Sequence, residues 1–306
     1  MKLSALCVLL CGMSGCEKVV KFKVDDITPY VVVLSEPVAD SMVSVSLKYS
    51  RFFLSNKEFR CVDDAQARLL QNGNAVSLLK ASDGQYVFDC RPKAGDSLEL
   101  LLNVPKYEPI HAVTRVPQQP SVEAVLTVDT TYEYSYRCQL KVKIHDPLGA
   151  NYYRLFVEYS DWYLESDGKG DVDTVYVPNE AVLSTQDKVF TDVSSLDYLL
   201  NAGNSTVYDT YFLFSDELFN GREYVMTFDF DIYDCKYQNI IEKHPMYLRM
   251  SALSADMYRY RRTRDAYSNN EDFLSEPVQI YCNIDGGIGI FAASAETKVE
   301  LKPVYK

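Results

Sequence analysis

Two aspartates that could form an acid–base pair, Asp229 and Asp231, alternate with apolar residues in the segment Phe228–Ile232. Two carboxylates can hydrolyse a glycosidic bond when they oppose each other across a cleft. The same alternation is expected of a sheet with one face in the core and the other in water. We interpret the two aspartates as part of a wet face, and a hydrolase that uses them is the least favoured hypothesis.

A serine that could act as a nucleophile, Ser97, lies in the run Gly95-Asp96-Ser97-Leu98, which spells the nucleophile motif of one esterase family. That chemistry needs a histidine and an aspartate brought to the serine, together with backbone donors for the oxyanion. The paired Asp and His that the esterase carries near its C-terminus are absent. A hairpin turn explains the tetrapeptide, so we predict no catalytic residues.

Side chains that could hold a metal ion do not occur at useful spacings. His111, His145 and His244 are far apart, and the chain has neither a HExxH nor a CxxC motif. Residues 167–173 offer several carboxylates but lack the ligand order and the final Glu of a calcium loop. We predict a solvated hairpin tip there, and neither a metal nor a cofactor.

Two further runs resemble binding elements. The glycine-rich run Asn283–Phe291 lacks the Gly-Lys-Ser/Thr ending of a phosphate-binding loop. Its glycines are expected to allow positive φ or a close backbone approach.

Arg259, Arg261, Arg262 and Arg264 share one predicted helix. They could form a docking patch, but we interpret them as a solvated helix face.

Strict alternation of apolar and polar residues predicts the elements that must position these groups. Val43–Tyr49 and Leu98–Leu102 alternate in this way, and the turn signals Asn72-Gly73 and Asp83-Gly84 lie between such runs. Many short strands with frequent turns indicate an antiparallel sandwich of immunoglobulin-like type. We place this first domain at residues 24–116.

A short Pro-bounded link, Val116–Pro120, leads to a second β-rich domain, which we place at 117–306. The fold class is therefore mainly β, with two β-sandwich-like domains and one or two short helices in the second. Helices are predicted at residues 194–200 and 254–267, where Ser254 can cap the second. The strands expected here are 138–144, 153–159, 211–214, 225–232, 246–252, 278–282 and 299–301.

Composition limits the partners. The chain has 43 Asp and Glu against 31 Lys and Arg, and no long basic stretch, which argues against nucleic acid. It has 24 Tyr against one Trp. A tyrosine-lined face for sugars or peptides would explain this bias, but tyrosine is also favoured in strands, and we prefer that explanation.

The N-terminus has the layout of a secretory signal: Lys2, an apolar run from Leu3 to Met13, and small residues before Cys16. The run is too short to span a bilayer, which needs roughly 20 apolar residues. Met13–Cys16 resembles the lipobox of bacterial lipoproteins. This implies a signal peptide at 1–15, lipid such as palmitate on Cys16, a tether at 16–23 and anchoring to a membrane.

Five cysteines remain after Cys16, namely Cys61, Cys90, Cys138, Cys235 and Cys282. The export route permits disulfides. Cys61 and Cys90 lie in one predicted domain and could pair, whereas the alternative is five small buried thiols. Connectivity cannot be derived from sequence alone.

Motifs along nearly the whole mature chain resemble domain-of-unknown-function family 4249, lipoproteins of Gram-negative bacteria. The motifs that carry the resemblance are Cys16, Val62-Asp63-Asp64-Ala65, Gly84-Gln85-Tyr86, Ala112–Pro117, Asn151–Arg154, Phe214–Gly221, Ser254–Tyr260, Glu276-Pro277-Val278 and Gly286–Phe291. Such lipoproteins are often encoded beside TonB-dependent outer-membrane receptors. The family has no established enzymatic residues.

The resemblance implies a non-catalytic accessory binding protein of a TonB-dependent uptake system, held at the outer membrane through Cys16. Its ligand and the membrane face that it occupies, periplasmic or cell surface, stay open. The alternative is structural: a fimbrial or adhesin-type subunit, which is also lipidated and built from β-sandwiches in these bacteria.

Overall fold

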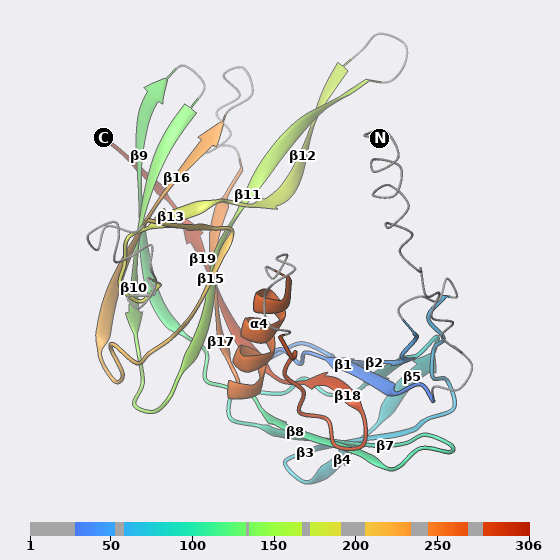
Figure 1. Ribbon diagram of the computed structural model, residues 1–306. Coiled ribbons are helices and arrows are strands. Elements are labelled where there is room, and N and C mark those ends of the chain that lie inside the picture. The colour runs from blue at the N-terminus through green and yellow to red at the C-terminus, as the bar shows by residue number, and fades with distance from the viewer. Residues whose placement is uncertain are drawn as a thin grey trace, which may run out of the picture.

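The computed structural model describes residues 28–52, 58–132, 135–166, 172–190, 206–233, 244–268 and 278–306. Within these residues the strands form four sheets, which pack as two sandwiches set at an angle to each other (Figure 1). The prediction of a mainly β fold is confirmed. No helix among the described residues is long and apolar enough to cross a membrane.

The first sandwich consists of a five-stranded and a four-stranded sheet. The five-stranded sheet has the order β18-β1-β2-β6-β5, with β1 Val31–Ser35, β2 Val43–Tyr49, β5 Leu78–Ser82, β6 Gln85–Phe88 and β18 Ile288–Phe291. The other has the order β4-β3-β7-β8, with β3 Gln66–Gln71, β4 Asn74–Val76, β7 Ser97–Asn103 and β8 Ile110–Arg115.

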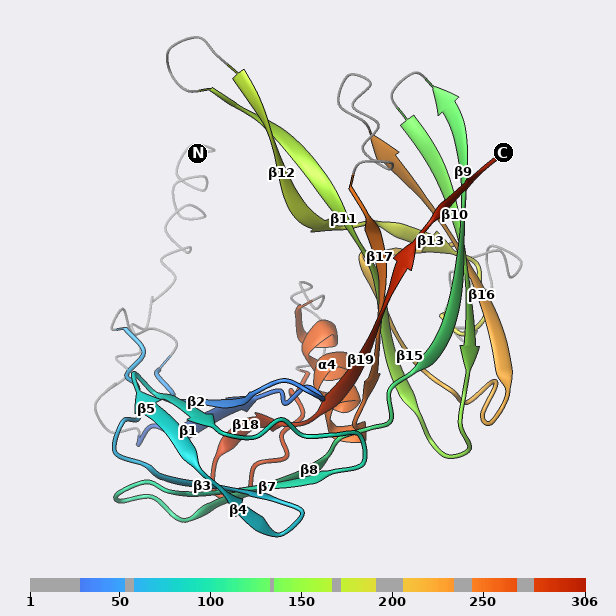
Figure 2. The ribbon, with the colours of Figure 1, turned by 180° about the vertical axis from the view of Figure 1, so that it is seen from behind.

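The second sandwich also has two sheets. One has the order β14-β13-β16-β10-β9-β20, with β9 Ser121–Tyr132, β10 Ser135–His145, β13 Leu183–Thr185, β14 Val207–Asp209, β16 Glu223–Tyr233 and β20 Pro303–Tyr305. The other has the order β12-β11-β17-β19 with β15 beside β11, comprising β11 Tyr152–Ser166, β12 Val172–Glu180, β15 Tyr211–Ser215, β17 Met246–Leu253 and β19 Ser294–Leu301. The β11–β12 hairpin extends past the rest of its sheet (Figures 1 and 2).

The alternating sequence pattern produces the two cores. Val43, Val45 and Leu47 of β2 are fully buried against the leucines of β7, whereas the residues between them face outward. Two-residue turns join the neighbouring strands at Asn72-Gly73 and Asp83-Gly84, and all four residues have positive φ. This is the conformation that the right-handed twist of a hairpin favours, so both predicted turns are confirmed.

The C-terminal segment takes part in both sandwiches, which the division at residues 116 and 117 does not anticipate. β18 pairs in parallel with β1, and Ile284, Phe291 and Ala293 lie in the first core. The chain then enters β19, which pairs with β17 of the second sandwich. Residues 117–306 therefore contribute to both cores.

The glycine-rich run permits this parallel pairing. Gly289 has a φ of 121°, and a Cβ atom there would overlap the carbonyl oxygen of Val33 on β1. Gly286 has a φ of 77° and lies against the backbone of Pro109. The predicted role of these glycines, positive φ and close approach, is confirmed.

The predicted strand at 278–282 is wrong, because this segment is irregular. Side-chain hydrogen bonds within and just after this segment join it to the helix that precedes it in the chain and to β18. Tyr281 N donates to Thr263 Oγ1 (2.9 Å), and Asn283 exchanges hydrogen bonds of 2.8 and 3.0 Å with the backbone of Phe291.

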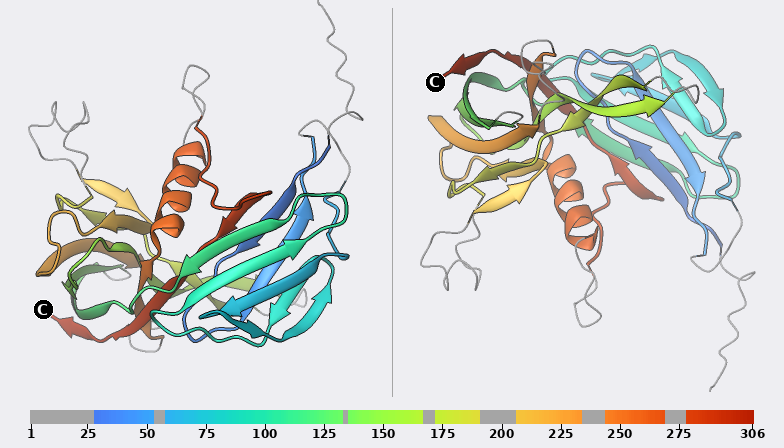
Figure 3. Two further views of the ribbon diagram at one scale, coloured as in Figure 1. Left: turned by 90° about the horizontal axis from the view of Figure 1, so that it is seen from below. Right: turned by 90° about the horizontal axis from the view of Figure 1, so that it is seen from above.

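Helix α4, Ala255–Ser268, lies in the angle between the two sandwiches (Figure 3). Ser254 caps it through a 3.3 Å hydrogen bond from Met257 N to Ser254 Oγ, as the sequence predicts. Met257 is buried against Leu253 and Ile290, so the helix touches strands of both sandwiches. The other predicted helix, 194–200, lies outside the described residues.

Candidate functional site: a groove along strand β15

The sequence-derived site residues are not brought together. Cys16 lies outside the described residues, so its lipidation stays a prediction. Cys61 and Cys90, whose pairing the sequence left open, are both free thiols in the structure. The thiol of Cys90 lies 3.4 Å from Gln71 Oε1. The backbone of Cys61 pairs with that of Lys48 in an isolated antiparallel β-bridge.

Of the other cysteines, Cys138 is buried in the second core, Cys282 is exposed, and both are free thiols. Burial raises the pKa of the Cys138 thiol to about 12, with a smaller contribution from Asp231. Such a thiol stays protonated and unreactive at neutral pH. Cys235 lies outside the described residues.

Asp229 and Asp231 lie on the outer face of β16, and Phe228 and Phe230 point into the core. Each aspartate has a cross-strand partner. Gln139 Nε2 donates to Asp229 Oδ1 at 3.1 Å, and Arg137 Nε is 3.8 Å from Asp231 Oδ1. The interpretation of a wet sheet face is confirmed.

Asp96 of the serine run is part of a turn. Its carboxylate accepts hydrogen bonds from Gln71, Asn72 and the backbone N of Lys93, and these bonds hold its pKa below the usual value. Ser97 opens β7, and its backbone N donates to Asn72 Oδ1. The turn explanation therefore holds.

The three histidines lie in different places. His111 contacts Glu99, His145 contacts Glu123 and Glu223, and His244 stacks on Tyr176. Among the described residues no group of three metal-binding side chains occurs. Most of the acidic run 167–173 is outside the described residues.

A groove with a volume of about 660 Å³ runs along β15, and we call it the β15 groove. Its lining comes from three parts of the chain that are separated in the sequence. The lining residues are Val189, Phe190, Val207, Asp209, all five residues of β15 (Tyr211–Ser215), Glu217, and Tyr258, Arg262 and Asp265 of α4.

One wall of the groove is aromatic and continuous with the second core. Phe190 packs edge-on against Phe212 and Phe214, with ring centroids 4.7 and 5.1 Å apart. Phe212 and Phe214 are almost completely buried. Such interlocked rings fix the inner side of β15.

The opposite wall is helix α4. Tyr152 of β11 stacks on Tyr258 of the helix with centroids 4.6 Å apart, and Leu213 of β15 packs in the same cluster. Burial, and then the Asp265 carboxylate, raises the pKa of Tyr211 to about 12. Tyr211 and Tyr258 both line the groove, so some of the surplus tyrosines lie together on one surface as well as in strands.

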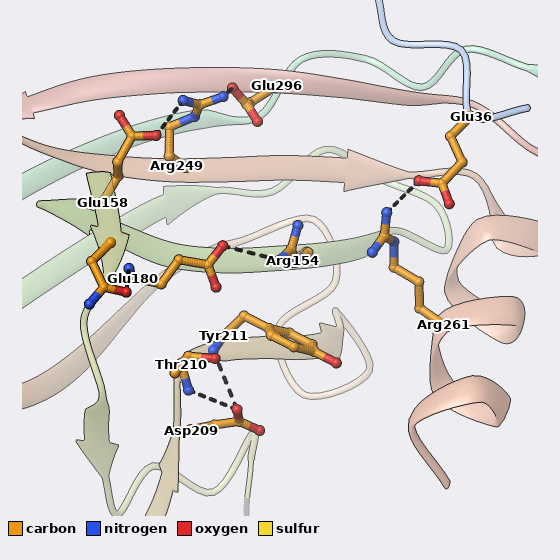
Figure 4. Close-up of polar contacts among 11 residues, drawn as sticks. Glu36, Arg154, Glu158, Glu180, Asp209, Thr210, Tyr211, Arg249, Arg261 and Glu296 are labelled. Carbon is orange, nitrogen blue, oxygen red and sulfur yellow. Dashed lines mark hydrogen bonds and ion pairs between the residues drawn. The ribbon is translucent and has the colours of Figure 1, made fainter. Parts of the chain in front are cut away.

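Three arginines, Arg154 of β11, Arg249 of β17 and Arg261 of α4, lie close to this part of the groove (Figure 4). The guanidinium of Arg154 lies over the rings of Phe156 and Tyr211, at 4.6 and 4.7 Å from their centroids. Burial, and then the charge of Arg261, lowers its pKa. This cation–π contact stabilises the position of the Tyr211 ring.

Arg261 joins the helix to the first sandwich. Its Nη2 is 2.5 Å from Glu36 Oε2, and its side chain is only 16% exposed (Figure 4). Arg249 of β17 forms ion pairs with Glu158 of β11 and Glu296 of β19, the two strands that flank it in the sheet. The sequence predicted that Arg261 lies on a solvated helix face. For this residue the prediction is wrong, because its side chain is mostly buried in an ion pair with Glu36.

The groove could not be found from the sequence. No motif marks residues 187–190, 207–217 or 258–265 as neighbours. Two weak signals existed. One was the surplus of tyrosine, which strands explain equally well, and the other was the arginine cluster that includes Arg262, which we interpreted as a solvated helix face.

Comparisons with known proteins add the family. The model of the family described as Domain of unknown function (DUF4249) matches residues 17–300. No curated protein matches the chain. Neither the family description nor the structures below name an enzymatic activity.

Two solved structures are similar to parts of the chain. One is Spo0M, a sporulation control protein from Bacillus subtilis, with 11% identity, a TM-score of 0.18, and coverage of 60% of this chain and 49% of that one. The other is a protein from Corynebacterium diphtheriae, described as membrane anchored, with 10% identity, a TM-score of 0.20, and coverage of 91% and 63%. The chain thus covers less than two thirds of either protein.

Proposed function

The chain belongs to the DUF4249 family, and from this premise we propose that it is a non-catalytic binding lipoprotein that assists a TonB-dependent receptor at the outer membrane. Lipid on Cys16 holds the two sandwiches at the membrane. The bound partner or ligand occupies a surface of the second sandwich. Support for anchoring comes from the lipobox-like N-terminus, and support for the receptor comes from the family resemblance.

The observation that carries the binding role is the β15 groove. Its volume of about 660 Å³ is within the usual range of ligand sites, roughly 300–1,000 Å³. Aromatic walls with charged groups such as Asp209 and Arg262 are the usual composition of a recognition site.

Binding without catalysis agrees with the state of the acidic side chains. Asp229 lines a separate hollow of about 370 Å³ together with Asp187. Asp187 Oδ1 already accepts hydrogen bonds from Tyr224 Oη (2.8 Å) and Val189 N (3.0 Å). Asp229 faces Gln139. Both carboxylates thus serve local structure.

The proposal is tested by affinity purification from native outer membranes in mild detergent. The tagged chain is expected to recover a β-barrel receptor in near-equal amount, and the Cys16→Ala chain, which lacks the anchor, to recover far less. Recovery of polymers of the chain itself, without a barrel receptor, would contradict the proposal and favour a fimbrial or adhesin subunit.

A further inference from the structure

We propose that the β15 groove binds an extended, basic segment of a partner protein, which adds a strand to the free edge of β15. This inference rests on the proposed binding function and names the kind of partner. Strand addition supplies affinity through main-chain hydrogen bonds and specificity through alternate side chains.

The first step is the free edge. Among the described residues β15 pairs only with β11, in a register that runs from Tyr152 opposite Ser215 to Phe156 opposite Tyr211. A strand paired on one side presents unpaired N–H and C=O groups on the other. Five residues give an edge of about 17 Å, because a strand rises roughly 3.4 Å per residue.

The second step is that the groove follows this edge. All five residues of β15 line it. Phe212 and Phe214 face the core side, and Tyr211, Leu213 and Ser215 face the α4 side, since side chains alternate along a strand. An added strand would place alternate side chains against Phe190 on one side and Tyr258 on the other.

The third step is charge. The lining contains three carboxylates, those of Asp209, Glu217 and Asp265, and one cation, Arg262. Asp209 precedes the strand and Glu217 follows it, and neither carboxylate forms an ion pair with any side chain in the described part of the chain. Complementary charge therefore favours lysine or arginine at both ends of the bound segment.

The same charges disfavour a second copy of this chain. Two β15 edges brought together would place acidic groups against acidic groups, in a chain whose net charge is −12. Charges on an edge are a common means of preventing self-pairing. The occupant is therefore a basic segment from another protein.

The test is selection of random nine-residue peptides, displayed on phage, against the full mature chain in detergent. Enriched peptides are expected to be net basic, with β-branched or aromatic residues at alternate positions. A synthetic copy should lose at least tenfold in affinity when alternate amides along one edge are N-methylated. It should also lose at least tenfold against Asp209→Lys/Glu217→Lys.

The matched control is Glu165→Lys/Asp173→Lys, which makes the same charge change on the β11–β12 hairpin and should leave peptide affinity unchanged. Circular dichroism verifies that both variants fold. The inference is overturned if no peptide is enriched, if enriched peptides have no basic bias, or if affinity survives N-methylation of either edge.

The inference and the proposed function can fail separately. Receptor recovery by the wild-type chain, without peptide binding, would remove the inference and keep the function. Peptide binding without recovery of any receptor would keep the inference about the β15 groove and remove the proposed role beside a receptor.

Discussion

Tyr153 donates a 2.6 Å hydrogen bond from its hydroxyl to Oδ1 of Asp146, and the two side chains are buried at one end of the second sandwich. Gly221 N donates to the other oxygen of Asp146 at 2.7 Å, and the buried carboxyl of Asp216 lies beside it. The carboxyl of Asp146 therefore joins the loop after β10 both to β11, through Tyr153, and to the loop after β15, through Gly221. The loop after β15 contributes Glu217 to one end of the β15 groove.

Replacing Tyr153 by phenylalanine removes the hydroxyl and leaves a buried carboxylate oxygen without its donor. An unsatisfied buried group of this kind costs about 1–3 kcal/mol, so we expect the free energy of unfolding to fall by this amount in urea titrations. Tyr208→Phe, at a residue that is 69% exposed, is the control. If the two substitutions had equal effects, the hydrogen bond from Tyr153 to Asp146 would not stabilise the fold as proposed.

The stability of the protein is expected to depend on the protonation of Asp146. Burial, and then the neighbouring Asp216, raises the pKa of Asp146 above its ordinary value of 3.8. Between pH 3.8 and the higher folded-state pKa, the folded protein keeps a proton on Asp146 that the unfolded chain has lost. This contribution to stability is complete below pH 3.8 and is lost as the pH rises through the higher folded-state pKa.

The variant Asp146→Asn cannot titrate at this position. Its free energy of unfolding, relative to the wild type, is therefore expected to improve as the pH rises above 3.8. Denaturant titrations at several pH values measure this difference. A difference that is constant with pH, or that falls as pH rises, would show that Asp146 does not keep its proton in the folded state.

Gly289 is expected to be essential for joining the C-terminal segment to the first sandwich. In Gly289→Ala the new methyl group meets the carbonyl of Val33 as well as the strain of a positive φ. We expect a loss of more than about 4 kcal/mol, the size that marks a severe local conflict.

Gly73→Ala is the matched control, because Gly73 also has a positive φ but open space around it. The φ penalty alone is about 1–2 kcal/mol. Thermal or denaturant unfolding compares the two variants, and a Gly289→Ala protein as stable as Gly73→Ala would refute the close approach of β1 and β18.

Cys16 is predicted to carry the membrane anchor. The Cys16→Ala chain should lose palmitate labelling and move to the soluble fraction, because several acyl chains at about 0.8 kcal/mol per buried methylene provide the attachment. Cys282→Ala, at an exposed thiol, should label normally. Retention of the Cys16→Ala chain in membranes would show that another feature holds it there.

Local patterns in the sequence predicted much of the fold. Asn72-Gly73 and Asp83-Gly84 specify their hairpins because only residues that tolerate positive φ fit such turns. Leu98 and Leu100 specify their buried face because strand side chains alternate. Both signals act over a few residues, so each can be interpreted without knowledge of the rest of the chain.

The candidate site depends on long-range packing and could not be predicted in this way. Tyr211 and Tyr258 become neighbours only when α4 packs against β11, and Arg261 is buried only because Glu36 arrives from the first sandwich. Ile284 and Phe291 return to the first core after more than a hundred intervening residues. No local pattern encodes these pairings, because the contacts that select them are tertiary.

Amide hydrogen exchange of β15 tests the central claim, that the anchored protein holds a partner in the β15 groove, most directly. The chain is compared in native outer membranes and in lipid vesicles that contain no other protein, which separates the partner from the bilayer. We predict that amides within Tyr211–Ser215 exchange more slowly in native membranes, since an added strand pairs with the free edge. Equal exchange of this strand in both preparations would contradict the account.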